Sequence, residues 1–236
     1  MPSKIKNIVY NVILEVEKST GIINYDKSYN MKLYKKNYEL IGDLLKDINL
    51  INRKGKIKMN DLKLVEPNVN DKKSALLMLE EIKVADAGLP WQYSGLANLE
   101  EATSYEEWVK EKDDESKGIN LKDGYVACTT LLLKRESDGK ICGSISIRHE
   151  LNDFLFQIGG HIGYSITPSE RGKGYGKLQL KIALEIAKKL GIEKCLITTD
   201  EKNIVSNKTI ISEGGILENT VMGNDEPLNR YWINLK

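Results

Sequence analysis

A group of three glycines between a short apolar segment and an amphipathic segment constrains the fold of this chain more than any other feature. The apolar segment spans residues 161–167, and Pro168 ends it because proline has no N–H for sheet pairing. The residues after the glycines carry apolar side chains at helical spacing up to Leu190, and Gly191 stands where a helix cap is expected. The pattern therefore predicts a strand, a glycine-rich loop and a helix. The three glycines are Gly172, Gly174 and Gly176.

The predicted helix has one buried face. Apolar residues recur at every fourth position, and charged residues, mostly lysine, occupy the opposite side. The positions expected to be buried are Leu178, Ile182, Ile186 and Leu190, with Ala183 and Ala187 beside them.

The start of this helix is a candidate anion site. The first N–H groups of a helix have no intrahelical partners, and the helix dipole favours negative charge there. A Walker A loop is excluded because Lys177 is followed by Leu178, and Arg171 stands where that motif needs its first glycine. A dinucleotide fingerprint is excluded because Lys177 occupies the place of its third glycine. A phosphate-binding loop remains, and so does a tight turn that needs glycine only for its backbone angles.

The remaining pattern, Arg171-x-x-Gly174-x-Gly176 between a strand and a helix, resembles the pyrophosphate loop of the GNAT superfamily of N-acetyltransferases. In that family the loop reads Arg or Gln, two residues, Gly, one residue, then Gly or Ala. The resemblance runs from about residue 62 to the C-terminus and is strongest over residues 160–215. It implies acetyl-CoA as co-substrate, with the diphosphate on main-chain amides and the pantetheine arm between two splayed strands. The residues that it implies for cofactor binding are Ser165, Ile166, Arg171, Gly172, Lys173, Gly174, Tyr175, Gly176 and Asn203.

The resemblance also implies a fold class. This is α/β (α+β), a GNAT-like mixed, mostly antiparallel sheet of six or seven strands flanked by helices, with a small helical N-terminal extension. The chain's own periodicity agrees, and Asp138-Gly139 is a type I′ hairpin signal between two of the strands. The expected strands span residues 62–66, 125–135, 140–149, 161–167, 192–199, 216–221 and 228–235. The expected helices begin near residues 70, 104, 174 and 203.

Residues 1–60 are predicted to form a separate, basic and helical extension, and residues 61–236 the GNAT-like domain. The extension holds 12 Lys and Arg against 6 Asp and Glu, whereas the remainder holds 23 against 28. A basic arm suits nucleic acid, but it lacks the arginine cluster and stacking aromatics of such sites, so a solvated Lys- and Asn-rich segment without a target is the alternative. Met59 opens a stretch that could itself begin a protein, which favours a boundary at residue 60.

Composition argues against a membrane or metal partner. No apolar run approaches the roughly 18 residues that a membrane span needs. Cys128, Cys142 and Cys195 are odd in number and far apart, which predicts buried free thiols in a reducing cytoplasm. Their spacing fits no metal site, so we expect no metal.

Acetyl transfer to an amine needs a neutral nucleophile, a thioester held in place and a donor for the developing oxyanion. The resemblance assigns that donor to the main-chain N–H of Ser165 or Ile166. His161 is the first candidate for the general base, because many relatives carry glutamate there and imidazole titrates near pH 6.5. The alternative is a histidine that orders the preceding Gly-Gly turn. His149 and Glu150 are the next candidates, or they form a solvated strand end.

The usual general acid of the family is missing. Many relatives place a tyrosine at the eighth residue of a run that begins with asparagine, and counting from Asn203 this position is Ile210. Asn203 itself can bind pantetheine or merely cap a helix. Trp91, Tyr93 and Tyr164 are the candidates for contact with the acceptor, although packing of the aromatic loop onto the core would also explain Trp91 and Tyr93.

Three functions follow. The first is an acetyl-CoA-dependent N-acetyltransferase that acts on a primary amine of a small molecule, peptide or protein by direct attack in a ternary complex. The second is a non-catalytic acetyl-CoA sensor on the same fold, suggested by the missing tyrosine. In the third, residues 1–60 deliver the acetylating domain to nucleic acid. The sequence indicates neither the acceptor amine nor the oligomeric state.

Overall fold

The computed structural model of the chain describes residues 61–223 and 225–236. The helices and the basic arm predicted within residues 1–60 lie outside this part, so those expectations, and the boundary at residue 60, stay predictions. Seven strands and four longer helices follow one another in the described part in the predicted order. Among the described residues, no helix has both the length and the apolar character that crossing a membrane requires.

The strands form two antiparallel sheets. The first has the order β1-β2-β3-β4, and the second has the order β5-β7-β6. Strands of the first are β1 (Leu62–Val65), β2 (Cys128–Arg135), β3 (Ile141–Arg148) and β4 (Ile162–Ile166). Strands of the second are β5 (Lys194–Asp200), β6 (Ile216–Met222) and β7 (Pro227–Asn234).

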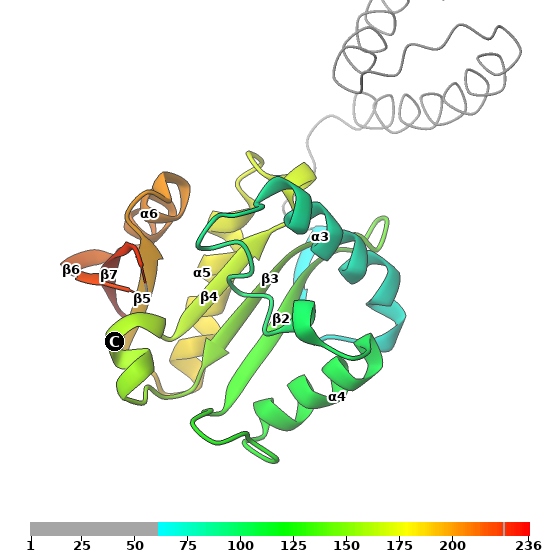
Figure 1. The fold of residues 1–236 in the computed structure, drawn as a ribbon, viewed down its shortest axis with the longest axis horizontal. Helices are drawn as coiled ribbons and strands as arrows, with labels where there is room; N and C mark the ends of the chain where they lie inside the picture. The colour runs from blue at the N-terminus through cyan, green and yellow to red at the C-terminus, as the bar shows by residue number, and fades with distance from the viewer. Residues whose placement is uncertain (1–60, 224) are drawn as a thin grey trace, which may run out of the picture. The chain divides into compact units, whose positions relative to one another are not determined.

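Helices cover both faces of the four-stranded sheet. Figure 1 shows α3 and α4 on one side of it and α5 on the other. The longer helices are α3 (Lys72–Ala85), α4 (Tyr105–Ser116), α5 (Tyr175–Lys189) and α6 (Ile204–Ser212). Short turns of helix are η2 (Val69–Asp71), η3 (Leu99–Glu101), the π-type η4 (Leu155–Gly159) and η5 (Pro168–Glu170).

The β2–β3 hairpin differs from its prediction in two ways. A type I′ turn needs positive φ at both central residues, but of Asp138 and Gly139 only Gly139 has one, at 70°. The pairing register also shifts within the hairpin: Leu133 pairs with Gly143, but the next residue, Lys134, pairs with Ile141. Since a shift of one residue exchanges the two faces of a strand, Ile141 packs with α3 and α4 while Ile145 packs with α5.

The buried face of α5 is also displaced from the predicted one. Ala183 and Ala187 are fully buried, whereas Leu190 is 41% exposed. Small side chains at the contact let the helix approach the sheet closely, so the stripe is centred on the alanines. Gln179 is buried as well, because its Nε2 donates to the carbonyl oxygens of Ser144 at 3.0 Å and Ser165 at 3.3 Å. This amide holds the start of α5 against β3 and β4.

Candidate functional site

The two sheets meet at β4 and β5, and ordinary ladder pairing does not continue between these strands. At the start of β4, the His161 N–H donates to the Leu196 carbonyl at 2.7 Å. The Leu196 N–H in turn donates to the imidazole Nδ1 of His161 at 2.9 Å. The imidazole of His161 thus accepts the hydrogen bond that a main-chain carbonyl would accept in a continuous sheet. Beyond this point β4 and β5 separate.

Glycine is required at position 160, where the chain passes close to β5. Gly160 has a φ of +66°, and a Cβ there would lie 2.8 Å from the Leu196 carbonyl oxygen. Any larger residue would push β4 away from β5 or strain the backbone. Beside it, the Thr198 hydroxyl donates to the Ile158 carbonyl at 2.8 Å and fixes the preceding π-helical turn.

The register of β3 and β4 determines which main-chain groups face the gap. The Thr167 N–H donates to the Cys142 carbonyl at 3.0 Å, and the Arg148 N–H donates to the His161 carbonyl at 2.8 Å. In an antiparallel pair such bonds alternate along the strand, so Ser165 directs its N–H toward β3. Ile166 directs its N–H toward the gap. Of the two oxyanion donors expected from sequence, the register favours Ile166.

A cavity of about 870 Å³ occupies this gap. One wall is β4, and the opposite wall comes from the end of β5 and the start of α6. The glycine loop closes one end, and the segment that follows α3 contributes a further side. Residues far apart in the sequence therefore share one cavity. Those at its glycine-rich end are Gly172, Gly174, Tyr175, Gly176 and Lys177.

The glycine loop leaves room for an anion. Gly172 and Gly174 have φ values of +75° and +80°, and a Cβ at either would meet no other heavy atom within 4 Å. Tyr175, Gly176 and Lys177 form the first turn of α5, where N–H groups lack intrahelical partners. The open backbone and the positive end of the helix dipole fit a diphosphate group.

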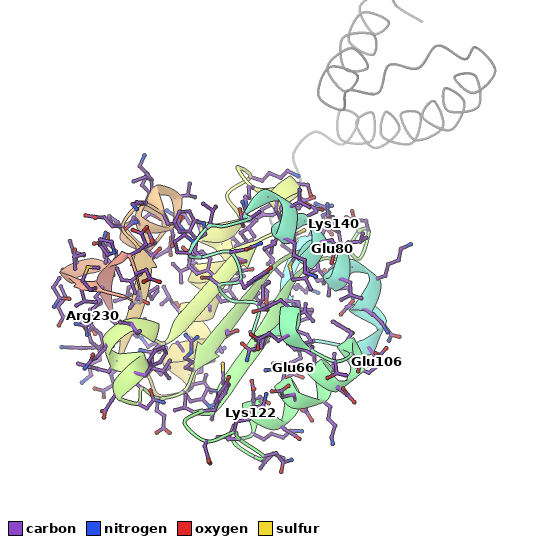
Figure 2. All side chains as sticks on the ribbon, viewed as in Figure 1. Glu66, Glu80, Glu106, Lys122, Lys140 and Arg230 are labelled. Atoms are coloured by element: carbon purple, nitrogen blue, oxygen red, sulfur yellow. The ribbon has the colours of Figure 1, made fainter. Side chains whose placement is uncertain are left out.

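The basic side chains of the loop are already paired with carboxylates. Arg171 makes a two-pronged ion pair with buried Asp86, with Nη1 and Oδ1 2.7 Å apart, and its Nε donates to the Ile166 carbonyl at 3.0 Å. Lys173 Nζ lies 2.8 Å from Glu170, whose carboxylate also contacts Lys140, labelled in Figure 2. The loop's affinity for an anion therefore rests on main-chain amides, while these ion pairs hold its shape.

The surroundings of His161 bear on its two predicted roles. Its side chain is buried and does not line the cavity, and burial lowers its pKa to about 4. Because Nδ1 accepts the Leu196 N–H, the neutral ring carries its proton on Nε2, which is then a donor. This arrangement argues against His161 as the proton acceptor and supports the ordering role.

The other two candidates for the base also lie away from the cavity lining. His149 Nε2 is 2.8 Å from the Thr129 hydroxyl, and burial lowers the pKa of this imidazole. Glu150 is exposed at the end of β3. Neither residue is among those that line the gap.

Tyr164 brings a phenol next to α6, the helix on which the usual tyrosine of the family is missing. Its side chain crosses from β4 to α6, where its hydroxyl lies 3.1 Å from Ser206 Oγ. Burial raises the pKa of Tyr164, so the hydroxyl keeps its proton at neutral pH. Ile210, the position of the missing acid, is fully buried in the core. The sequence signal for Tyr164 was an aromatic in β4, without any indication of its contact with α6.

The remaining predicted residues divide between the cavity and its surroundings. Asn203 lines the cavity and also caps α6, since its Oδ1 accepts the Ser206 N–H at 3.1 Å. Trp91 lines the cavity, whereas Tyr93 does not and is 38% exposed. Within residues 61–223 and 225–236, no three His, Cys, Asp or Glu side chains come together as a metal site would need.

The loop that carries Trp91 packs directly on β4. The Ser144 hydroxyl donates to the Gly95 carbonyl at 2.7 Å, and the Ser165 hydroxyl donates to the Ser94 carbonyl. Gly95 approaches so closely that a Cβ there would lie 2.6 Å from the Tyr164 nitrogen. The position of this cavity wall therefore depends on glycine.

The sequence is similar to a family of known proteins. Residues 93–209 match the model of the acetyltransferase (GNAT) family. No protein with a curated description matches the sequence.

Several solved structures share the fold. The chain is similar to yncA, described as a putative acetyltransferase from Salmonella typhimurium with its cofactor acetyl-CoA, at 14% identity and a TM-score of 0.52, over 75% of this chain and 95% of that one. The microcin C7 self-immunity acetyltransferase MccE, in complex with acetyl-CoA and AMP, is similar at 17% identity and a TM-score of 0.52, over 74% and 92%. An N-acetyltransferase from Staphylococcus aureus Mu50 is similar at 15% identity and a TM-score of 0.53, over 74% and 99%. These likenesses confirm the predicted fold class.

Proposed function

Because the chain carries a domain of the acetyltransferase (GNAT) family over residues 93–209, we propose that it transfers an acetyl group from acetyl-CoA to a primary amine. One observation carries this proposal. A single cavity contains both an unpaired strand edge, on β4, and the open amides of the glycine loop. Two of the similar structures, yncA and MccE, are described with acetyl-CoA, which supports the same co-substrate here.

The residues of the cavity suggest how the co-substrate is held. Main-chain amides of the glycine loop bind the diphosphate, and the Nδ2 of Asn203 is available to donate to the pantetheine arm because its Oδ1 serves the helix cap. Acetyl-CoA supplies an electrophilic thioester when bound. The gap-facing N–H of Ile166 donates to the oxygen that gains charge as the amine attacks.

Proton transfers complete the reaction. The carbon–nitrogen bond forms and the carbon–sulfur bond breaks in one ternary complex. Tyr164 donates its phenolic proton to the departing sulfur, and the proton that the amine loses restores the phenol through water. Ser206 orients the phenol by their shared hydrogen bond. Water takes the relay role because His149, Glu150 and His161 do not line the cavity.

The alternative of a non-catalytic sensor depends on the aliphatic residue at Ile210. Tyr164 weakens that argument, since it lines the cavity and brings a phenol from β4 to α6. We therefore favour catalysis. The acceptor belongs to the class of primary amines, whether free or at a peptide terminus.

A thiol-release assay tests the proposal. The full chain is mixed with acetyl-CoA and a panel of amino acids, aliphatic amines, aminoglycosides and peptides, and products are identified by mass spectrometry. We expect release of free CoA together with an acetylated amine for one class of the panel. Acetyl-CoA binding without turnover of any amine would support the sensor instead.

A further inference from the structure

A second cavity, of about 600 Å³, adjoins the first. The two share wall residues, so they lie side by side. The segment after α3, the π-helical turn, the end of β5 and the β6–β7 connection surround the second cavity. The residues common to both are Leu89, Pro90, Ile158, Asp200 and Leu228.

Asp200 stands at the junction with one oxygen unpartnered. This residue ends β5, and its side chain is 3% exposed. Oδ1 accepts the Lys202 N–H at 2.7 Å, whereas Oδ2 is buried without a hydrogen-bond partner. An unpaired buried carboxylate oxygen is costly, so such an atom in a residue that lines both cavities points to a ligand that donates to it.

The charge of the second cavity matches a cation. Its lining includes the carboxylates of Asp200, Asp225 and Glu226, and its described lining residues include no lysine or arginine. Lys202 reaches Glu226 Oε2 at 2.7 Å and neutralises that one carboxylate. The net charge of the lining therefore remains negative after this pair is counted.

Apolar side chains line the rest of the second cavity. Phe154, Ile158 and Leu228 line it together with Leu89 and Pro90. The π-helical turn below is held in place, because Arg230, labelled in Figure 2, donates from Nη2 to the Phe156 carbonyl at 2.9 Å. Apolar walls and carboxylates suit a methylene chain that carries an ammonium group.

We propose that the acceptor is an aliphatic diamine, whose second ammonium group binds Asp200 Oδ2 in the acidic second cavity while its first amine reacts in the gap between β4 and β5. This assignment rests on the proposed function, since it names the acceptor class of the same site. Asp200 acts as a binding residue for the remote ammonium and takes no part in proton transfer.

A matched pair of amines tests the assignment on the full chain. Pentylamine and 1,5-diaminopentane have the same carbon chain and differ by one amine. We expect kcat/KM for the diamine to exceed that for pentylamine by about 10- to 100-fold, the worth of one hydrogen bond between charged groups. Asp200→Asn keeps the acceptor for the Lys202 N–H and removes the charge, so it should raise KM for the diamine by a similar factor and leave pentylamine unchanged.

Asp123→Asn is the control, because it removes the same charge from an exposed loop residue outside both cavities. It should change neither amine's KM. Equal kcat/KM for the two amines would overturn the assignment. So would an Asp200→Asn variant that loses kcat for both amines at unchanged KM, because that result describes a proton acceptor.

Calorimetry separates this assignment from the proposed reaction. Binding of 1,5-diaminopentane to the wild-type chain and its loss in Asp200→Asn can be measured without turnover. Diamine binding without CoA release would refute the reaction and keep the cation site. CoA release with other amines, but no diamine binding, would refute the cation site and keep the reaction.

Discussion

The imidazole Nδ1 of His161 accepts the Leu196 N–H at 2.9 Å, and the His161 N–H donates to the Leu196 carbonyl at 2.7 Å. The residue just before β4 therefore makes both of these hydrogen bonds to one residue of β5. Its side chain ends the pairing of the two strands where a main-chain carbonyl would have continued it. The gap that accommodates the candidate active site begins at this point.

His161→Asn tests this structural role. Asparagine offers an oxygen acceptor to the Leu196 N–H and does not titrate, so kcat/KM should stay within a few-fold of wild type. A general base at this position would instead cost about 100-fold or more. Steady-state kinetics at pH 7.5 decide between the two.

The His161→Asn variant should also change how the free energy of unfolding depends on pH. The pKa of His161 is about 4 in the folded chain and near 6.5 when unfolded, so between these values the unfolded chain binds more protons. The stabilisation from the neutral ring is present above the unfolded pKa and is lost as the pH falls toward 4, which costs roughly 3 kcal/mol. Urea denaturation from pH 7 to 4.5 should show a steeper loss for wild type than for His161→Asn. Parallel stability curves for the two proteins would contradict this role of the neutral His161 ring. His149 contributes equally to both proteins and so cannot account for a difference.

Gly95 and Gly88 form a matched pair for the wall of the cavity. Their φ values are +75° and +76°, so alanine strains the backbone equally at both, by about 1 to 2 kcal/mol. A Cβ at Gly88 meets open space, but one at Gly95 would lie 2.6 Å from the Tyr164 nitrogen. Gly95→Ala should therefore lose several kcal/mol more of unfolding free energy than Gly88→Ala, because backbone atoms must move. Equal losses in urea denaturation would show that the loop does not press on β4.

Tyr164→Phe tests the phenol as proton donor. The variant keeps the ring and removes the hydroxyl beside Ser206, so kcat should fall by about 100-fold or more. The dissociation constant for acetyl-CoA should stay near the wild-type value. Tyr93→Phe removes the same atom from a residue outside the cavity and should leave both quantities unchanged. An unchanged kcat in Tyr164→Phe would leave the thiolate to depart without an acid.

The sequence predicts the elements around the site because local patterns define them. Three glycines and a following amphipathic run are sufficient for the loop and helix α5, and the strand periods place most of the remaining elements. The buried face of α5 was predicted only in part: Ala183 and Ala187 are buried as expected, but Leu190 is exposed, because the pattern of leucine and isoleucine does not reveal that the stripe is centred on the alanines. Gln179 also lies on the buried face of α5, at a position where the pattern predicted no buried residue.

Local sequence patterns could not predict the roles of single residues in the site. His161 and Leu196 are 35 positions apart, and Tyr164 and Ser206 are 42 apart, so their contacts arise only when the sheets come together. The sequence therefore left His161 open between a base and a residue that orders the Gly-Gly turn, and it suggested Tyr164 only as a substrate contact. Asp200 went unnoticed for the same reason, since an unpartnered oxygen is defined by its surroundings and has no motif.

Acetyl-CoA binding to a matched pair of glycine variants tests the central claim most directly. Gly174 and Gly191 flank α5 with φ values of +80° and +89°, and a Cβ at either meets no atom within 4 Å, but only Gly174 of these two lines the cavity. Leucine strains both positions alike, whereas at Gly174 it also fills the space over the loop amides. Isothermal titration calorimetry should show Gly174→Leu weakening acetyl-CoA by about 10-fold or more, the loss of at least one hydrogen bond to a charged group, with Gly191→Leu close to wild type. Wild-type affinity in Gly174→Leu would contradict the account.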